Sequence, residues 1–269
     1  MRRLAVILIS ALSLAGCARA LKEPPALADL GGGAGRHAPE EVDDLLKKGS
    51  VLYAERTLEG VREAAGVFLA AARADTRRID GLMEAVRAQV WLADHETDPE
   101  RRVLSATGAV QAAQWCGRIA PSRPPCDYWL GAALGVQARE RRSTALDALP
   151  KIVEAFQRAA AGEPGFDEGG PDRALSLLYA RAPGWPTGPG DPDLALVHAR
   201  KAVDLKPDYP PNHLALAEAL AAVGETSASL EAYRRALDMA RRSAESGDPD
   251  APEWVREAEE ALARANANS

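Results

Sequence analysis

The stretch LKPDYPPNHLALAEALAAVGETSASLEAYRRA, residues 205–236, contains two alanine-rich segments joined at Gly224. Apolar residues recur three and four positions apart in both segments, which places one apolar stripe on each predicted helix. Pro207 lies just before the first segment, where a proline ends any helix that precedes it. The stretch therefore predicts two helices that turn back on each other.

Pro207 is one of three prolines at equal spacing. Pro121, Pro164 and Pro207 lie 43 residues apart, and each follows a predicted amphipathic helix. Small or apolar residues occupy the positions twelve, eight and five residues before each proline: Ala109, Ala113 and Cys116; Ile152, Phe156 and Ala159; Ala195, Ala199 and Ala202. Such residues line one face of a helix and let a partner helix approach closely. A repeated helical hairpin is the structure that this pattern predicts.

The pattern resembles the tetratricopeptide repeat (TPR). The residues at that family's consensus positions are Leu216, Ala217, Leu220, Gly224, Tyr233 and Ala236, with Ser229 where alanine is usual. An earlier unit surrounds Ala64, Phe68 and Ala71, with Thr76 in place of its closing proline. We therefore expect an all-α fold of four to five antiparallel helical hairpins, stacked as a TPR-like α-solenoid over residues 39–269. An irregular helical bundle is the alternative.

The repeat is longer than usual. A step of 43 residues exceeds the family's 34, so longer helices or inserted turns are needed. Asp98-Pro99 and the proline- and glycine-rich run 183–191 are the expected insertions.

The N-terminus has the layout of an export signal. Arg2 and Arg3 precede the apolar residues 4–12, and Leu14-Ala15-Gly16-Cys17 follows them. This apolar stretch is too short to cross a bilayer. It resembles a bacterial lipoprotein signal peptide, which implies that residues 1–16 are removed and that Cys17 is lipidated. An ordinary secretory signal or an uncleaved anchor is the alternative.

The residues after the predicted signal peptide indicate the location of the protein and a tether. We expect a protein anchored by lipid in the bacterial cell envelope and facing the periplasm. Ala18 stands where an aspartate often marks retention in the inner membrane, so the outer membrane is favoured over the inner one. Residues 17–38 include Pro24-Pro25 and Gly31-Gly32-Gly33 without sustained periodicity. This composition predicts a flexible tether.

Composition argues against several classes of function. The chain has 33 basic and 39 acidic residues, and loss of Arg2 and Arg3 makes it still more negative, which disfavours a nucleic-acid partner. Its four histidines, residues 37, 95, 198 and 213, accompany no nucleophile–base pair, zinc motif or phosphate loop. We therefore expect no catalytic site, no bound metal and no cofactor.

Cys116 and Cys126 flank a short connector between two predicted hairpins. An exported protein meets an oxidising compartment, so we expect these two cysteines to form a disulfide. Metal binding by the pair would need a nearby histidine or a second CxxC motif, and the sequence has neither.

A more specific resemblance rests on the order of several short motifs. Asp127-Tyr128-Trp129 is followed by GGPDRAL at 169–175, LYARAPGWP at 178–186 and Gly190-Asp191. This order is similar to that of the T-component lipoproteins associated with TRAP-type transporters, over roughly residues 50–242. The resemblance implies a lipid-tethered periplasmic repeat protein that cooperates with an extracytoplasmic substrate-binding protein. It also implies assembly into an oligomer and passage of a hydrophobic small molecule through a central cavity.

These motifs contain the candidate ligand or partner surface: Tyr128, Trp129, Arg173, Tyr179 and Trp185. For the aromatic residues the alternative is ordinary core packing, and we expect Trp185 to fold back on the helices rather than to line a ligand mouth or subunit contact. Arg173 is expected to brace a loop or to pair with Asp191 rather than to bind a ligand. We expect the remaining tryptophans, Trp91, Trp115 and Trp254, to serve packing.

Two functions remain. The first is a lipid-anchored periplasmic adaptor, in its specific form a T-component-like partner of a substrate-binding protein in TRAP-type uptake. The second is an outer-membrane lipoprotein scaffold or assembly factor for an envelope machine, without small-molecule cargo. Cargo transport predicts an apolar cavity lined by Trp129, Tyr179 and Trp185, whereas an assembly role predicts an open polar groove.

Overall fold

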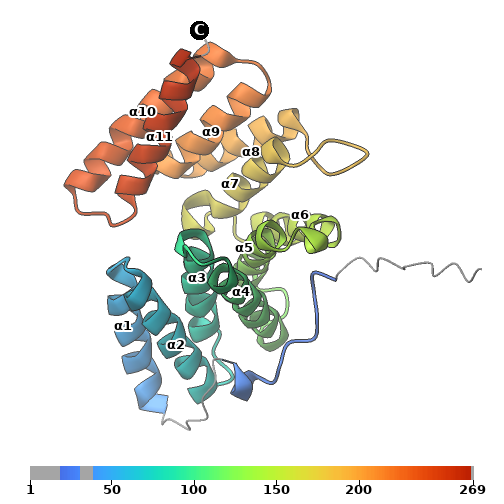
Figure 1. Cartoon of the computed structure of the whole chain (residues 1–269), viewed down its shortest axis with the longest axis vertical. Coiled ribbons are helices and arrows are strands. Elements are labelled where there is room, and N and C mark those ends of the chain that lie inside the picture. The colour runs from blue at the N-terminus through green and yellow to red at the C-terminus, as the bar shows by residue number, and fades with distance from the viewer. Residues whose placement is uncertain (1–18, 31–38, 268–269) are drawn as a thin grey trace, which may run out of the picture.

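The structure is a computed structural model that describes residues 19–30 and 39–267 (Figure 1). The α-helices are α1 (Pro39–Ala54), α2 (Leu58–Ala74), α3 (Asp80–His95), α4 (Pro99–Ile119), α5 (Pro124–Glu140), α6 (Ala145–Gly162), α7 (Phe166–Arg181), α8 (Pro192–Leu205), α9 (Pro210–Ala222), α10 (Thr226–Glu245) and α11 (Ala251–Ala267). Two short 3-10 helices, η1 (Leu27–Asp29) and η2 (Arg142–Thr144), complete the described elements. Within these ranges, strand-like pairing is limited to one bridge between Gly184 and Gly190.

The helices pack in consecutive pairs, α1 with α2 through α9 with α10, and α11 packs on α10. This arrangement confirms the predicted all-α fold of stacked TPR-like hairpins, with five hairpins and one final helix in the described part of the chain. It excludes the irregular bundle.

The three regularly spaced prolines each lie two residues beyond a helix end, after α4, α6 and α8. The alanines at the repeat positions on these helices are buried, and most of them have no exposed surface at all. Because their side chains are small, the paired helix packs directly against them. Each expected insertion lies between the two helices of a hairpin. Asp98-Pro99 lies between α3 and α4, where Asp98 caps the start of α4, and the run 183–191 connects α7 to α8.

Odd-numbered helices form the inner layer. Each of α1, α3, α5, α7 and α9 contacts the next odd-numbered helix, while the even-numbered helices lie outside them and pack mainly on their two neighbours in the chain. The array curls, and the turn between α10 and α11 comes back over the first hairpin (Figure 1). A hollow lined by residues of α1, α3, α5 and α11 lies between the two ends of the array.

Residues 19–30, expected to be a flexible tether, instead lie across the outer layer from α6 past α4 to α2 (Figure 1). The buried positions are Ala20, Pro24, Leu27 and Leu30. Backbone groups of the segment bond to side chains: Ala20 N–H donates to Asp147 at 2.7 Å, Trp115 Nε1 donates to the Pro25 carbonyl at 2.9 Å, and Arg73 donates to the Leu30 carbonyl. Spaced apolar residues and satisfied backbone groups hold this stretch in place, with η1 as its one short helical turn.

Cys116 and Cys126 form the predicted disulfide, with their Cα atoms 5.4 Å apart. The bond joins the last turn of α4 to the first turn of α5. The predicted signal peptide, residues 1–16, and the lipidation site Cys17 lie outside the described residues. Across the ranges that are described, no helix has the length and apolar character needed to cross a membrane.

Two glycines of α5 provide a test of hairpin packing. A Cβ atom at Gly131 would lie 2.7 Å from the Phe156 ring of α6, whereas a Cβ at Gly135 would meet nothing within 4 Å. We expect Gly131→Ala to lower the free energy of unfolding by about 1–3 kcal/mol through overpacking. The matched change Gly135→Ala should raise it by about 0.5–1 kcal/mol, because alanine loses less backbone entropy in a helix. Urea unfolding of both variants measures this difference, and equal effects would contradict the packing described here.

Candidate binding cleft

A cleft of about 410 Å³ lies on the inner side of the array, between its two ends. Its aromatic lining is Tyr53 of α1, Trp91 of α3, Trp129 of α5, Tyr209 before α9 and Trp254 of α11. Five separate elements thus each bring one aromatic ring to a single hollow, in a chain whose aromatic content is only 5%.

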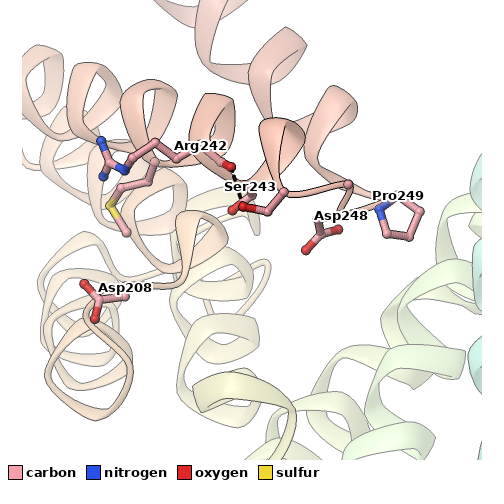
Figure 2. A pocket seen from close by; sticks show the side chains of 8 residues that line it. Asp208, Arg242, Ser243, Asp248 and Pro249 are labelled. Carbon is pink, nitrogen blue, oxygen red and sulfur yellow. Dashed lines mark hydrogen bonds between the residues drawn. The ribbon is translucent and has the colours of Figure 1, made fainter.

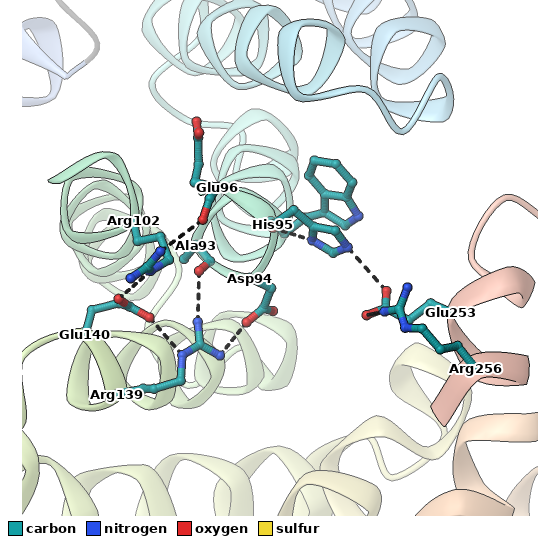
Figure 3. Close-up of polar contacts among 10 residues, drawn as sticks. Ala93, Asp94, His95, Glu96, Arg102, Arg139, Glu140, Glu253 and Arg256 are labelled. Carbon is teal, nitrogen blue, oxygen red and sulfur yellow. Dashed lines mark hydrogen bonds and ion pairs between the residues drawn. The ribbon is translucent and has the colours of Figure 1, made fainter. Parts of the chain in front are cut away.

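Two ion pairs, which we call the clasp, join the first two hairpins to the start of α11 across this cleft. Arg56 binds Asp250 through two hydrogen bonds of 2.6 and 2.8 Å. His95, at the end of α3, lies 3.3 Å from Glu253 (Figure 3). The Arg56 guanidinium also lies 4.0 Å from the centre of the Tyr53 ring, so the clasp is in direct contact with the aromatic lining.

The cleft wall includes a strained corner at the start of α7. Asp167, Glu168 and Gly169 have φ angles of 48°, 56° and 78°, in the left-handed region that non-glycine residues seldom adopt. Arg173 braces the corner by donating to the Asp167 and Glu168 carbonyls at 3.1 and 3.2 Å and to the Asp167 carboxylate at 2.8 Å. Strain of this kind concentrates at functional sites, where the surrounding structure holds it.

Buried polar groups fix the corner from both sides. Asn212 has no exposed surface, and its amide donates to the carbonyls of Glu168, Ala202 and Lys206 at 3.0–3.1 Å. Tyr128 donates to the Asp167 carboxylate, and burial raises the pKa of Tyr128 well above its ordinary value of 10.0. Its hydroxyl therefore remains a proton donor at neutral pH, which keeps Asp167 at the edge of the cleft.

A network of arginine side chains fixes the position of the last turn of α3, which carries Trp91 and His95. Arg139 of α5 binds Asp94 and donates to the Ala93 carbonyl at 3.0 Å (Figure 3). It also donates at 2.9 Å to Glu140, whose other oxygen accepts from Arg102 at 2.9 Å. The last turn of α3 is thereby tied to both α4 and α5, and the Trp91 ring stacks on His95 with centroids 3.9 Å apart.

The structure does not gather the predicted surface residues in one place. Trp129 lines the cleft, as expected for a binding residue. Tyr128 and Tyr179 are only 7% and 6% exposed, so both are core residues, and Tyr179 packs on His198 between α7 and α8. Arg173 braces a loop as expected, but Asp191 caps α8 by accepting from Leu194 N–H at 3.0 Å and does not pair with it.

Trp185 does not fold back on the helices. Its side chain is 91% exposed on the connection between α7 and α8, so the expectation of local packing is wrong. The connection is rich in proline and glycine and bonds mainly to its own backbone, as when Gly190 N–H donates to the Pro183 carbonyl at 2.8 Å. Those bonds close the loop without the tryptophan ring, which is left in solvent.

Several cleft residues were missed by the sequence analysis. Trp91 and Trp254 pack against the core, as expected, but they also line the cleft, and so do Tyr53, Arg56 and Asp250. None of them belongs to a motif. Trp91 and Trp254 are 163 positions apart in the sequence, and only the curl of the array brings them together.

A second hollow, of about 510 Å³, lies between Asp208 and the turn that joins α10 to α11 (Figure 2). Its polar groups largely serve the end of α10: Ser246 Oγ donates to the Arg242 carbonyl at 3.0 Å, and Asp248 N–H donates to the Ser243 carbonyl at 3.0 Å. Its lining contains no aromatic residue. The inner cleft is therefore the better candidate for a binding site.

The described residues contain no group of three or more His, Cys, Asp or Glu side chains arranged to hold a metal ion. Among solved structures, TTC0263, a thermophilic TPR protein from Thermus thermophilus, is similar at 20% sequence identity and a TM-score of 0.60, covering 81% of this chain and 98% of that one. The MamA protein aligns at 16% identity and a TM-score of 0.46, over 77% and 95% of the two chains. No protein-family model and no curated protein matches the chain. The likeness to TTC0263 shows a TPR-like fold.

The clasp should weaken as pH rises. His95 Nδ1 lies 2.8 Å from the Trp91 carbonyl and donates to it, so Nε2 can donate to Glu253 only when the ring carries a second proton. The bond to Glu253 raises the pKa of His95 above 6.5, and His95 lowers the pKa of Glu253 below 4.5. The stabilisation by the His95–Glu253 ion pair is therefore complete between pH 4.5 and 6.5. It is lost as pH rises through the raised pKa of His95.

Hydrogen exchange of residues 251–255 measures this loss. After correction for the intrinsic rate, we expect exchange to increase roughly two- to fivefold between about pH 6 and about pH 8.5, as suits a half-exposed ion pair. His95→Gln should remove the pH dependence. Glu260→Gln should retain it, because Glu260 pairs only within α11. A pH dependence that persists in His95→Gln would contradict the role of His95.

Proposed function

We propose that this protein is a lipid-anchored periplasmic adaptor whose inner cleft binds an exposed segment of a partner protein. The observation that carries the proposal is the convergence of five aromatic side chains from five elements in one cleft. Stacked helical repeats bind partners through such inner surfaces, because each repeat contributes a few contacts to one extended site.

The chemistry of the cleft suits a protein segment better than a purely apolar cargo. Tryptophan, tyrosine and arginine are the side chains that contribute most to protein–protein binding. The aromatic rings are interspersed with charged groups, among them Arg56, Arg87 and Asp167. A partner segment with both apolar and polar side chains would meet complementary groups along the cleft.

The partner that we propose is an extracytoplasmic substrate-binding protein of a TRAP-type uptake system. This finer assignment rests on the order of sequence motifs between residues 127 and 191. In its GGPDRAL motif, Gly169 is the last residue of the strained corner and Arg173 braces that corner, and Trp129 of the first motif lines the cleft. Lipid attachment at Cys17 would keep such an adaptor at the membrane where uptake takes place.

A second candidate is a scaffold or assembly factor for an envelope machine, and Trp185 favours it. The residues expected to line a cargo cavity, Trp129, Tyr179 and Trp185, do not share one. Trp185 instead offers a large aromatic ring to solvent outside the cleft. An exposed tryptophan is a typical anchor for a second protein contact.

Photocrosslinking in the cell distinguishes these functions. The photoreactive amino acid p-benzoylphenylalanine replaces Trp129 or Trp254 in the cleft, and replaces Trp185 in a matched variant outside it. We expect both cleft positions to crosslink to one substrate-binding protein, while position 185 does not. Mass spectrometry identifies the crosslinked protein.

The other outcomes are informative as well. A secretion, pilus or other envelope-machine component crosslinked through position 185 would favour the scaffold. A cleft that crosslinks to no protein, in cells where position 185 does so, would contradict partner binding in the cleft.

Lipid attachment has its own test. We expect the intact mass of the full chain from the membrane fraction to correspond to a protein that begins at Cys17 and carries acyl chains. Cys17→Ser should abolish both the acyl mass and the cleavage, whereas a Cys116→Ser/Cys126→Ser double variant should retain them. A mature wild-type protein without acyl chains would contradict the proposed anchor.

A further inference from the structure

A small cavity of about 190 Å³ lies on the outer side of the protein, beside the docked segment 19–30. Its walls are residues 19–23 of that segment, residues 107–114 of α4, and the chain from the end of α5 into η2. This volume is below the range of about 300–1,000 Å³ that is usual for drug-sized ligands. It suits a small polar group.

Positive charge dominates the lining. Arg19, Lys22 and Arg141 line the cavity, and none of them forms an ion pair with any residue that the structure describes. The one acidic side chain in the lining, Glu23, is paired with Arg118 at 2.7 Å. Nearby Asp147 is bound by Lys151 at 2.6 Å and by Ala20 N–H at 2.7 Å. The charge of Arg19 also acts on Asp147 and helps to lower its pKa. Lys22 and Arg141 therefore remain in the lining without an ion-pair partner among the described residues, in an otherwise acidic protein.

A buried amide points to a missing ligand at the same place. Gln137 lines the cavity, is only 6% exposed, and its Oε1 atom has no hydrogen-bond partner among the described residues. The oxygen and nitrogen of a glutamine amide exchange places by a simple flip, so this group can present its NH₂ to an acceptor. A buried amide oxygen without a partner destabilises a protein unless a ligand or water satisfies the group.

We propose that this cavity binds a phosphate group, held by Lys22 and Arg141 together with the Gln137 amide, and that the phosphate belongs to the headgroup of an anionic lipid. Ammonium and guanidinium groups form their strongest hydrogen bonds with such anions. The choice of lipid rests on the proposed anchor, because Arg19 follows Cys17 by only two positions. A headgroup bound on the outer layer would hold the inner cleft on the side away from the bilayer.

Native mass spectrometry of the full lipoprotein in a non-ionic detergent tests the site. The probes are phosphatidylglycerol, phosphatidylcholine and inorganic phosphate. We expect one phosphatidylglycerol to bind about tenfold more tightly than phosphatidylcholine, and inorganic phosphate to bind more weakly than either lipid. The intact mass in the same spectrum reports lipidation of Cys17, so failure of the anchor and failure of the cavity are read separately.

Variants assign the binding to the cavity. Lys22→Gln/Arg141→Gln should weaken phosphatidylglycerol binding about tenfold, whereas Lys47→Gln/Arg234→Gln should not change it. The control pair makes the same change in charge at exposed residues that form no ion pair within the described ranges. Gln137→Met should also weaken binding, without lowering the melting temperature of the lipid-free protein, because its amide oxygen has no partner to lose.

If both charge variants lost affinity for phosphatidylglycerol equally, the proposal would be overturned, since net charge alone would then explain the binding of the anionic lipid. Inorganic phosphate that binds as tightly as phosphatidylglycerol would overturn the assignment to a lipid. Unchanged binding in Gln137→Met together with unchanged binding in Lys22→Gln/Arg141→Gln would exclude the cavity altogether.

Discussion

Close contact between helices at small side chains is the constraint on which the rest of this structure depends. At the positions where two helices of a hairpin meet, residues such as Ala109, Ala159 and Ala199 have no exposed surface. Glycine serves the same purpose in α5, where Gly131 lies against the Phe156 ring. A larger residue at these crossings would separate the helices and change the angle at which the next hairpin is added, and the curl of the array follows from those angles.

The cleft is a product of that curl rather than of any one hairpin. Its aromatic rings come from the inner helices and from Tyr209 just before α9, and the clasp forms only because the chain around the start of α11 returns to the first two hairpins. The strained corner at Asp167 is the local exception. There the chain departs from helix geometry in the middle of the wall, and a partly buried arginine and a buried asparagine hold it in place. The outer layer has a separate role, since the docked N-terminal segment crosses it.

The hairpins could be predicted from the sequence because their determinants are local. Pro121, Pro164 and Pro207 mark helix ends within two residues, and the disulfide closes a short connector between neighbours. The cleft could not be predicted in the same way, because its position depends on the rotations of five hairpins taken together. The sequence therefore predicted the packing of Trp91 and Trp254 but not their place in the cleft. Residues 19–30 were misjudged for a related reason: their fit depends on Asp147 and Trp115, far away in the sequence, and leaves no periodic pattern.

Closure at the clasp also bears on how this protein can evolve. An open solenoid gains or loses repeats with little effect on the others, because each repeat contacts only its neighbours. Here Arg56 and Asp250 meet only if the rotations of the hairpins between them add up to the angle that brings the two residues together. Duplication or deletion of one hairpin would carry Asp250 away from Arg56 and divide the aromatic lining between two separate surfaces. The number of repeats is therefore fixed by geometry, and change in this lineage should come through substitutions and loop lengths.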